Sequence, residues 1–258
     1  MPEVLPEAEP LSVDGGPVGC LVIHGFTGNP SSMRLIAEAM ADAGHSVEMP
    51  RLPGHGTTVE DMNTTSWADW SAEVEAAYQR LAGRCEHVVA MGLSMGGTLT
   101  AWIGAEHPDI AGLVLINAAA ERSDEMRAGL QAMLDAGETY MDGIGSDVAD
   151  PDVTESAYAK VPLAPLVSML DAVADLQDRL AGITAPALIM TSPEDHVVAP
   201  TASDHLAQTL GGPVERVTLE RSYHVATIDH DRDLIIERIR DFVRRVSSGS
   251  EGGTGPGA

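Results

Sequence analysis

The sequence predicts an α/β fold, in which a mostly parallel sheet carries helices on both faces. Short continuous apolar runs alternate along the chain with segments whose apolar residues recur at helical spacing. Continuous apolar runs are typical of strands that are buried on both faces of a parallel sheet, and their alternation with helices favours this fold class. The 258 residues suffice for one large core, so we expect a single domain that carries an insertion.

The first part of the chain supplies four of the expected strands and three of the expected helices. Gly44 and Gly83 stop the first two helices, and Ser66 and Asp69 match a capping box at the start of the second. Pro108 closes the third helix. The expected strands are 19–24, 46–49, 87–91 and 112–117, and the expected helices are 31–43, 66–81 and 97–105.

The alternation stops after residue 117 and returns after residue 170. The stretch 118–170 is rich in acids, methionines and scattered apolar residues, and we interpret it as a cap inserted into a core of residues 1–117 and 171–246. Residues 247–258 have almost nothing to bury and are predicted to be disordered. After the cap, strands are expected at 187–190 and 214–219 and helices at 202–210 and 231–246.

The charge of the chain restricts its partners. It has 39 acidic and 15 basic residues, which gives a formal net charge of −24. Nucleic acids and anionic membranes are recognised through clustered Lys and Arg, so neither is an expected partner. We expect a small or neutral ligand instead, and the composition leaves the oligomeric state open.

The sequence does not indicate a targeting segment, a membrane span or a metal. Residues 1–7 lack the basic start and the apolar stretch of a signal peptide, and no apolar run is long enough to cross a bilayer. We therefore expect a cytoplasmic enzyme without integral membrane association. Cys20 and Cys85 are expected to be free thiols, and the nine histidines form no metal-binding motif.

Ser94 lies at the turn between an expected strand and an expected helix. The motif GLSMG at 92–96 follows the apolar run 87–91 and precedes the helical segment 97–105. Small residues around such a serine allow the tight turn that lifts its hydroxyl above the edge of the sheet, so the context predicts a nucleophile elbow. The pentapeptide alone is a weak signal, and the interpretation requires a base and an acid in the right order.

An acid and a histidine follow Ser94 in that order. A serine hydroxyl becomes nucleophilic when an imidazole removes its proton, and an acid fixes the tautomer and stabilises the charge of that imidazole. Asp195 comes shortly after the strand 187–190 and His224 shortly after the strand 214–219, so both are expected at one edge of the sheet. We assign these residues as acid and base. The competing residues are Glu194 for the acid and His196, His205 and His230 for the base.

Two backbone amides are expected to stabilise the oxyanion that forms when Ser94 attacks. One is the N–H of Met95, immediately after the nucleophile, and the other is the N–H of Phe26 in the loop after the first buried strand. The loss of one such donor costs about 3 kcal/mol of transition-state stabilisation. Glycines in this loop allow the backbone to approach closely, and His24 is interpreted as structural.

Five sequence blocks together are similar to those of a known enzyme family. The blocks are HGFTG at 24–28, PGHG at 53–56, GLSMGG at 92–97, EDHVV at 194–198 and SYHVATID at 222–229. They resemble the bacterial monoacylglycerol lipases and their carboxylesterase relatives, which are α/β-hydrolases, and the resemblance extends over residues 19–246. It implies the α/β-hydrolase fold with an inserted cap, and ester hydrolysis without a cofactor.

Parts of the expected cap are similar to the cap of the lipase members. The segments 144–147 and 151–158 carry this likeness. It implies that Asn117 and Glu155 contact the glycerol hydroxyls, directly or through water, and that Ile144 shapes the pocket. The alternative is that Glu155 is one solvated acid among many. The stretch 120–136 does not resemble the family closely, which leaves the acyl entrance open.

The cap also contains apolar residues that fit two roles. Four methionines and four leucines supply flexible apolar surface suited to an acyl chain, but helically spaced apolar residues equally indicate packing. These residues are Met126, Met133, Met141, Met169, Leu130, Leu134, Leu163 and Leu166.

We interpret the chain as a serine hydrolase that cleaves monoacylglycerols to fatty acid and glycerol through an acyl-enzyme. A broader carboxylesterase for short or medium acyl chains, with the same triad, is the alternative. A non-catalytic ligand receptor of the same fold is disfavoured by the complete triad. A dehalogenase would need a carboxylate at the position of Ser94.

Overall fold

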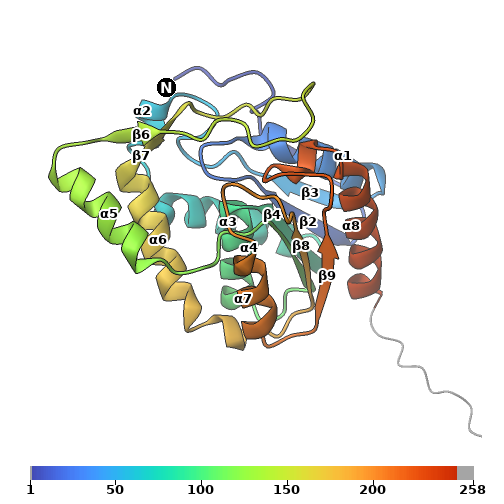
Figure 1. The fold of residues 1–258 in the computed structure, drawn as a ribbon. Coiled ribbons are helices and arrows are strands. Elements are labelled where there is room, and N and C mark those ends of the chain that lie inside the picture. Colours follow the sequence, from blue (N-terminus) through green and yellow to red (C-terminus); the bar gives the residue numbers. More distant parts are fainter. Residues whose placement is uncertain (1, 249–258) are drawn as a thin grey trace, which may run out of the picture.

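A seven-stranded sheet forms the centre of the computed structural model, which describes residues 2–248. The strand order is β1-β3-β2-β4-β5-β8-β9 (Figure 1). Neighbouring strands are parallel except for β1 with β3, which confirms the predicted mostly parallel sheet. The strands are β1 (Leu11–Val13), β2 (Val18–Ile23), β3 (Ser46–Met49), β4 (His87–Leu93), β5 (Gly112–Ile116), β8 (Ala187–Thr191) and β9 (Val214–Thr218).

Every strand expected from an apolar run is present, and β1 is an addition that the sequence does not reveal. β1 has three residues, its side chains are partly exposed, and it pairs antiparallel with β3, with Leu11 opposite Met49. A short, half-exposed edge strand has no continuous apolar run. Its pairing with β3 is therefore decided by the folded sheet and not by a local pattern.

Helices cover both faces of the sheet, as predicted (Figure 1). The core helices are α1 (Arg34–Asp42), α2 (Val59–Met62), α3 (Trp67–Ala82), α4 (Met95–Glu106), α7 (Thr201–Thr209) and α8 (Arg232–Ser247). Short 3-10 helices are η1 (Pro30–Met33), η2 (Leu180–Gly182) and η3 (Ala226–Ile228). Ile36 of α1 and Ile239 of α8 are buried together on one face, and Trp70 of α3 and Leu99 of α4 are buried on the other.

The predicted capping box at the start of α3 is present. The backbone N–H of Ser66 donates to the Asp69 carboxylate at 2.9 Å. The first N–H groups of a helix have no acceptor within the helix, and the Asp69 side chain supplies one for the N–H of Ser66. The chain enters α3 at the position that its sequence indicates.

The segment predicted as a cap folds into a helix pair and a small ribbon. α5 (Asp124–Asp135) packs on α6 (Leu163–Gln177), and β6 (Tyr140–Asp142) pairs antiparallel with β7 (Lys160–Pro162). α6 continues to Gln177, past residue 170, and its Leu176 belongs to the main core. The division into core and cap stays a prediction, as does the disorder of residues 247–258, of which 249–258 lie outside the described residues.

The segment between β6 and β7, residues 143–159, lies against the loops at the carboxyl edge of the sheet, and we call it the strap. The Tyr158 N–H donates to the Thr27 oxygen at 3.2 Å in the loop after β2. The Val225 N–H, in the segment after β9, donates to the Asp147 oxygen at 3.0 Å. The strap therefore joins two loops that are distant in the sequence, on the edge where the parallel strands end.

Candidate active site

Ser94 forms the sharp turn between β4 and α4. Strand β4 ends at Leu93 and helix α4 begins at Met95, so Ser94 is the only residue between them. Its backbone has φ 56° and ψ −119°, a conformation that residues other than glycine rarely adopt. Its N–H donates to the Ile116 oxygen of β5 at 3.0 Å, which holds the turn. The structure therefore contains the strand, strained turn and helix of the predicted elbow.

Glycines make this turn possible because nothing larger fits. A Cβ on Gly92 would lie 2.2 Å from the carbonyl carbon of Gly96, and a Cβ on Gly96 would lie 2.2 Å from the Ile23 oxygen. Both distances are far shorter than an ordinary van der Waals contact between heavy atoms. A Cβ on Gly25 would lie 3.4 Å from the Cβ of Ser94. The loop after β2 therefore lies directly against the serine.

Asp195 and His224 meet across the loops that follow β8 and β9. Nδ1 of His224 lies 2.7 Å from Oδ2 of Asp195, and their side chains are only 8% and 2% exposed. The other oxygen of Asp195 accepts the N–H groups of Val197 and Val198, each at 2.8 Å. Because an ionised carboxylate only accepts hydrogen bonds, Nδ1 carries the proton and Nε2 is left free to accept one.

The residues that compete for these roles have other surroundings. Glu194 is exposed, whereas the carboxylate that reaches His224 is that of Asp195. The geometry therefore supports the preferred acid and base, whose catalytic roles stay predictions. The other histidines contact different partners: His196 with Asp147 at 2.8 Å, His205 with Gln177 at 2.6 Å, and His230 with Asp150 at 3.7 Å.

The two amides expected to bind the oxyanion lie beside Ser94. Met95 is the first residue of α4, so its N–H has no acceptor within the helix. Phe26 follows Gly25, which contacts the serine, and its N–H has no acceptor among residues 2–248. Both donors are therefore free for a ligand oxygen.

Two buried histidines support the loop that carries Phe26. Nε2 of His24 accepts the Leu52 N–H at 3.2 Å, so the proton is on Nδ1, which donates to the Gly25 oxygen at 2.9 Å. Burial lowers the pKa of His24 to about 4, although the bond to Gly25 opposes this change. His55 packs 5.0 Å from His24, ring centre to ring centre. These contacts support the structural role expected of His24.

Asn117, expected to contact glycerol, is engaged by the protein itself. It is 2% exposed. Its Nδ2 donates to the His224 oxygen at 2.8 Å and to Oγ of Ser192 at 3.0 Å, and its Oδ1 accepts the Ser192 N–H at 2.8 Å. Both amide hydrogens are therefore used, and only one lone pair of Oδ1 is left. Asn117 holds the loop of His224, and its contact with glycerol stays a prediction.

Glu155 of the strap lies near both the loop after β2 and the His224 side chain. Its Oε1 is 3.0 Å from the place that a Cβ on Gly28 would take. Burial raises the pKa of Glu155 to about 7, while His224 opposes the rise and Asp147 adds to it. A solvated acid would keep its usual pKa. Near neutral pH this carboxyl group is thus able both to donate and to accept a hydrogen bond.

The other residues of the predicted cap divide between packing and exposure. Ile144 is 66% exposed and Met126 is 54% exposed, so neither side chain packs in the interior. The role of Ile144 in shaping a pocket stays a prediction. Leu130 and Leu163 are buried in a small cluster against which Met133, Leu134 and Leu166 pack, and Met169 belongs to the main core.

Two buried acids at this site are missed by sequence reasoning. Asp147 accepts the His224 N–H at 3.0 Å, and Asp229 accepts the N–H groups of Tyr223 at 2.9 Å and Ala149 at 2.8 Å. Ala149 and Asp229 are 80 positions apart, so no local spacing indicates their contact. The available signals are that Asp147 ends the segment 144–147 and that Asp229 ends the block 222–229.

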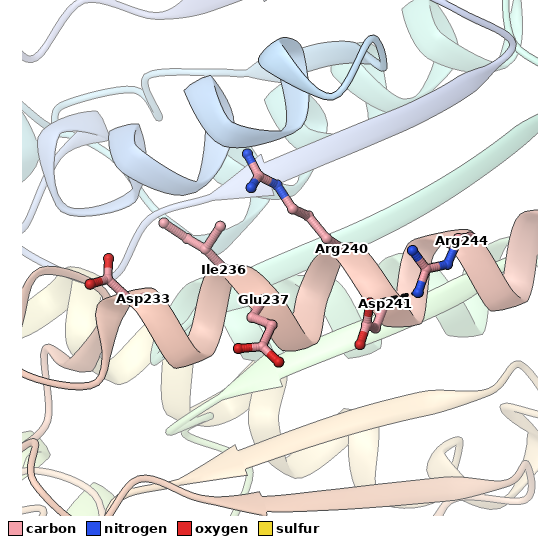
Figure 2. Close-up of a pocket in the computed structure, with 6 residues that line it drawn as sticks. All are labelled: Asp233, Ile236, Glu237, Arg240, Asp241 and Arg244. Atoms are coloured by element: carbon pink, nitrogen blue, oxygen red, sulfur yellow. Dashed lines mark hydrogen bonds and ion pairs between the residues drawn. The ribbon is translucent and has the colours of Figure 1, made fainter.

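A surface pocket along α8 is separate from this site. Figure 2 shows its lining side chains, all from α8, with Arg244 paired to Asp241 at 2.8 Å. Its acids and bases are mixed, and none belongs to the elbow or to the loops after β8 and β9. The pocket therefore has no part in the chemistry of Ser94.

The parallel sheet, the elbow and the Asp195–His224 pair together define an α/β-hydrolase. The chain matches the family model of the alpha/beta hydrolase family over residues 20–238, and it belongs to this family. The fold class predicted from the sequence is therefore confirmed.

Individual relatives are similar over nearly the whole chain. The chain is 48% identical over 242 residues to the thermostable monoacylglycerol lipase of Bacillus sp. (strain H-257), which covers 93% of this chain and 95% of that protein. It is 26% identical to the carboxylesterase of Bacillus subtilis (strain 168), covering 92% and 97%. A solved structure from work on the metagenome-derived lipolytic enzymes LipS and LipT has a TM-score of 0.90 at 42% identity, covering 94% and 100%. The predicted resemblance is confirmed.

Proposed function

We propose that the chain is a serine hydrolase that cleaves monoacylglycerols to fatty acid and glycerol. The observation that carries this proposal is the elbow of Ser94 beside the 2.7 Å contact of His224 with Asp195. The 48% identity to a monoacylglycerol lipase supports the choice of substrate. The similarity to a carboxylesterase supports ester hydrolysis in general.

The proposed reaction uses side chains and amides of this chain together with one water molecule. Oγ of Ser94 attacks the acyl carbon while Nε2 of His224 takes the hydroxyl proton, and the Met95 and Phe26 amides hold the oxyanion. The ester C–O bond then breaks, and His224 returns the proton to the departing glycerol oxygen. Water, activated by His224, attacks the acyl-enzyme and releases the fatty acid and the Ser94 hydroxyl.

We assign Glu155 to the glycerol head group. Its carboxyl group lies beside the loop of Phe26 and near His224, which is where the leaving alcohol must lie for His224 to protonate it. At its pKa of about 7 it is able to bind a hydroxyl as donor or as acceptor. Esters without a free hydroxyl would gain nothing from this contact.

No helix of residues 2–248 is long and apolar enough to cross a membrane. We propose a small-molecule ester substrate that reaches the enzyme from solution or from dispersed lipid. The cytoplasmic location stays a prediction from the sequence.

Replacement of the nucleophile tests the proposed chemistry. Ser94→Ala should abolish ester hydrolysis and covalent labelling by a fluorophosphonate, because the attacking oxygen is removed. Thermal unfolding should show that the variant still folds. Near-normal turnover by a folded Ser94→Ala protein would require another nucleophile, and Ser94 would then not be the catalytic serine.

Replacement of Glu155 tests the substrate class. A buried hydroxyl partner is worth on the order of 1–3 kcal/mol when its loss leaves a group unpaired. Glu155→Ala should therefore lower kcat/KM on monoacylglycerols by roughly tenfold or more and change p-nitrophenyl ester hydrolysis far less. Asp152→Ala, at an exposed acid of the same strap, is the matched control. Equal losses on both substrates would favour the broader carboxylesterase.

A further inference from the structure

Asp147 is a strap residue that faces the two loops carrying the acid and the base. It is 8% exposed and lies eight positions before Glu155 in the sequence. Its main-chain oxygen accepts the Val225 N–H at 3.0 Å. Asp147 ends the segment 144–147, but the sequence assigns it no role, and the reaction outlined above does not use it.

The carboxylate of Asp147 makes three contacts with those loops. Its Oδ2 accepts the backbone N–H of His196 at 3.1 Å and the backbone N–H of His224 at 3.0 Å. Its Oδ1 lies 2.8 Å from Nδ1 of the His196 ring. One carboxylate oxygen therefore bridges two backbone amides that are far apart in the sequence.

These two amides belong to the residues that decide where the acid and the base lie. His196 directly follows Asp195 in the chain, and His224 is the base itself. The contact of Asp195 with His224 at 2.7 Å joins the same two loops through their side chains. A carboxylate that fixes both backbones therefore fixes the distance across which these side chains meet.

We infer that Asp147 is a positioning residue, which holds the loops of Asp195 and His224 in register through one bridging oxygen. The inference rests on the proposed triad. Asp147 acts through the backbone and does not contact the substrate. Its removal should slow the chemical step more than it weakens substrate binding, because a shift of about 1 Å in a reacting group costs up to about a hundredfold in rate.

Other contacts attach the strap, so the role of Asp147 can be separated from that of an anchor. Asp229 accepts the Ala149 and Asp150 N–H groups at 2.8 and 3.0 Å. At the other end of the strap, Asn29 donates to the Ser156 oxygen at 2.7 Å and the Tyr158 hydroxyl donates to the Gly54 oxygen at 2.8 Å. A variant at Asp147 retains all of these contacts.

The test compares three variants with the unmodified enzyme on one soluble ester. Asp147→Ala removes the bridge and should lower kcat about 10- to 100-fold while KM changes less than about threefold. Asp147→Asn retains an oxygen that is able to accept both N–H groups, and it should recover kcat to within a few fold. His196→Ala removes the ring contacts with Asp147 and Tyr223 but leaves the backbone N–H, so its kcat should stay close to that of the unmodified enzyme.

A proton NMR measurement adds a readout that a general packing role would not change. The proton between His224 and Asp195 should give a low-field resonance in the unmodified enzyme and in Asp147→Asn, and this resonance should be lost in Asp147→Ala. If Asp147→Ala does not fold, Asp147→Glu takes its place, because the longer side chain retains the charge but displaces the oxygens. It should have a lower kcat than Asp147→Asn.

Several results would overturn the inference. A backbone bridge would be contradicted if kcat were unchanged in Asp147→Ala or if only KM rose in that variant. It would also be contradicted if Asp147→Asn and Asp147→Glu had equal rates, or if His196→Ala lost as much activity as Asp147→Ala. Ser94→Ala, measured in parallel, separates this failure from failure of the proposed triad. A dead Ser94→Ala with a normal Asp147→Ala would overturn only the role of Asp147.

Discussion

The carboxyl group of Glu155 has a pKa near neutrality because it is shielded from solvent. Burial is the largest cause of its pKa of about 7, and the neighbouring Asp147 adds to it. His224 acts in the opposite direction, because a positive charge on its ring would favour the carboxylate. The protonation of Glu155 is therefore linked both to folding and to the charge of the proposed base.

This linkage predicts how Glu155→Gln changes stability with pH. The folded chain holds the proton with a pKa of about 7 and the unfolded chain with the usual 4.5. The stabilising contribution of the acid is thus fully present below about pH 4.5 and is lost as the pH rises through 7. The melting temperature of Glu155→Gln, relative to the unmodified protein, should increase over this range.

Thermal unfolding at several pH values measures this difference. Asp152→Asn, at an exposed acid of the strap, serves as the control for the loss of a surface carboxylate. A difference for Glu155→Gln that is constant, or largest at low pH, would show that Glu155 is not held in its neutral form by burial.

The turn between β4 and α4 is the element on which the site depends. The backbone strain at Ser94 is sustained because Gly92 lets α4 pack closely against β4 and Gly96 lets α4 pack closely against β2. The same packing leaves no space for a side chain. The conformation that presents Ser94 and the first amide of α4 is thus determined by close contact between backbones.

Paired glycine substitutions test this dependence. Gly96→Ala places a Cβ 2.2 Å from the Ile23 oxygen and should lower the free energy of unfolding by about 1–3 kcal/mol or more. Gly129→Ala, on an exposed position inside α5 with no heavy atom within 4 Å of its Cβ, should raise it by about 1 kcal/mol. Urea unfolding measures both, and equal stabilities would contradict the packing argument.

The whole molecule is strongly acidic, and this charge opposes its compact state. With 39 acids and 15 bases, repulsion between carboxylates acts over the surface at neutral pH. Ion pairs such as Arg84 with Glu48 at 2.7 Å relieve it locally. The small number of bases prevents such relief over most of the surface.

Added salt should therefore stabilise the protein. Raising NaCl from 0.01 M to 1 M shortens the Debye length from about 30 Å to about 3 Å, which screens repulsion between exposed carboxylates. The melting temperature should rise steadily over this range. Choline chloride should act in the same way if screening is the cause. A flat or falling melting temperature, or a response to Na⁺ alone, would exclude general screening.

Much of the fold follows from local patterns in the chain. The apolar runs predict strands such as 46–49 and 112–117, and the Ser66–Asp69 capping box marks the start of α3. These signals depend on neighbouring residues, so they are readable without knowledge of the fold. The edge strand β1 and the short strands β6 and β7 carry no such pattern, and their pairing becomes definite only in the folded chain.

By itself, the sequence determined the order of the elements and the positions of Ser94, Asp195 and His224 at the ends of strands, because periodicity and motif spacing are local properties. Only the tertiary structure decided which groups meet there. In the folded chain the Asp147 carboxylate accepts the backbone N–H of His224, which is 77 positions away in the sequence. Both amide hydrogens of Asn117 are donated to protein acceptors. Burial in the folded chain also raises the pKa of Glu155. Contacts of this kind depend on how distant loops pack, and such packing leaves no mark in the spacing of residues along the chain.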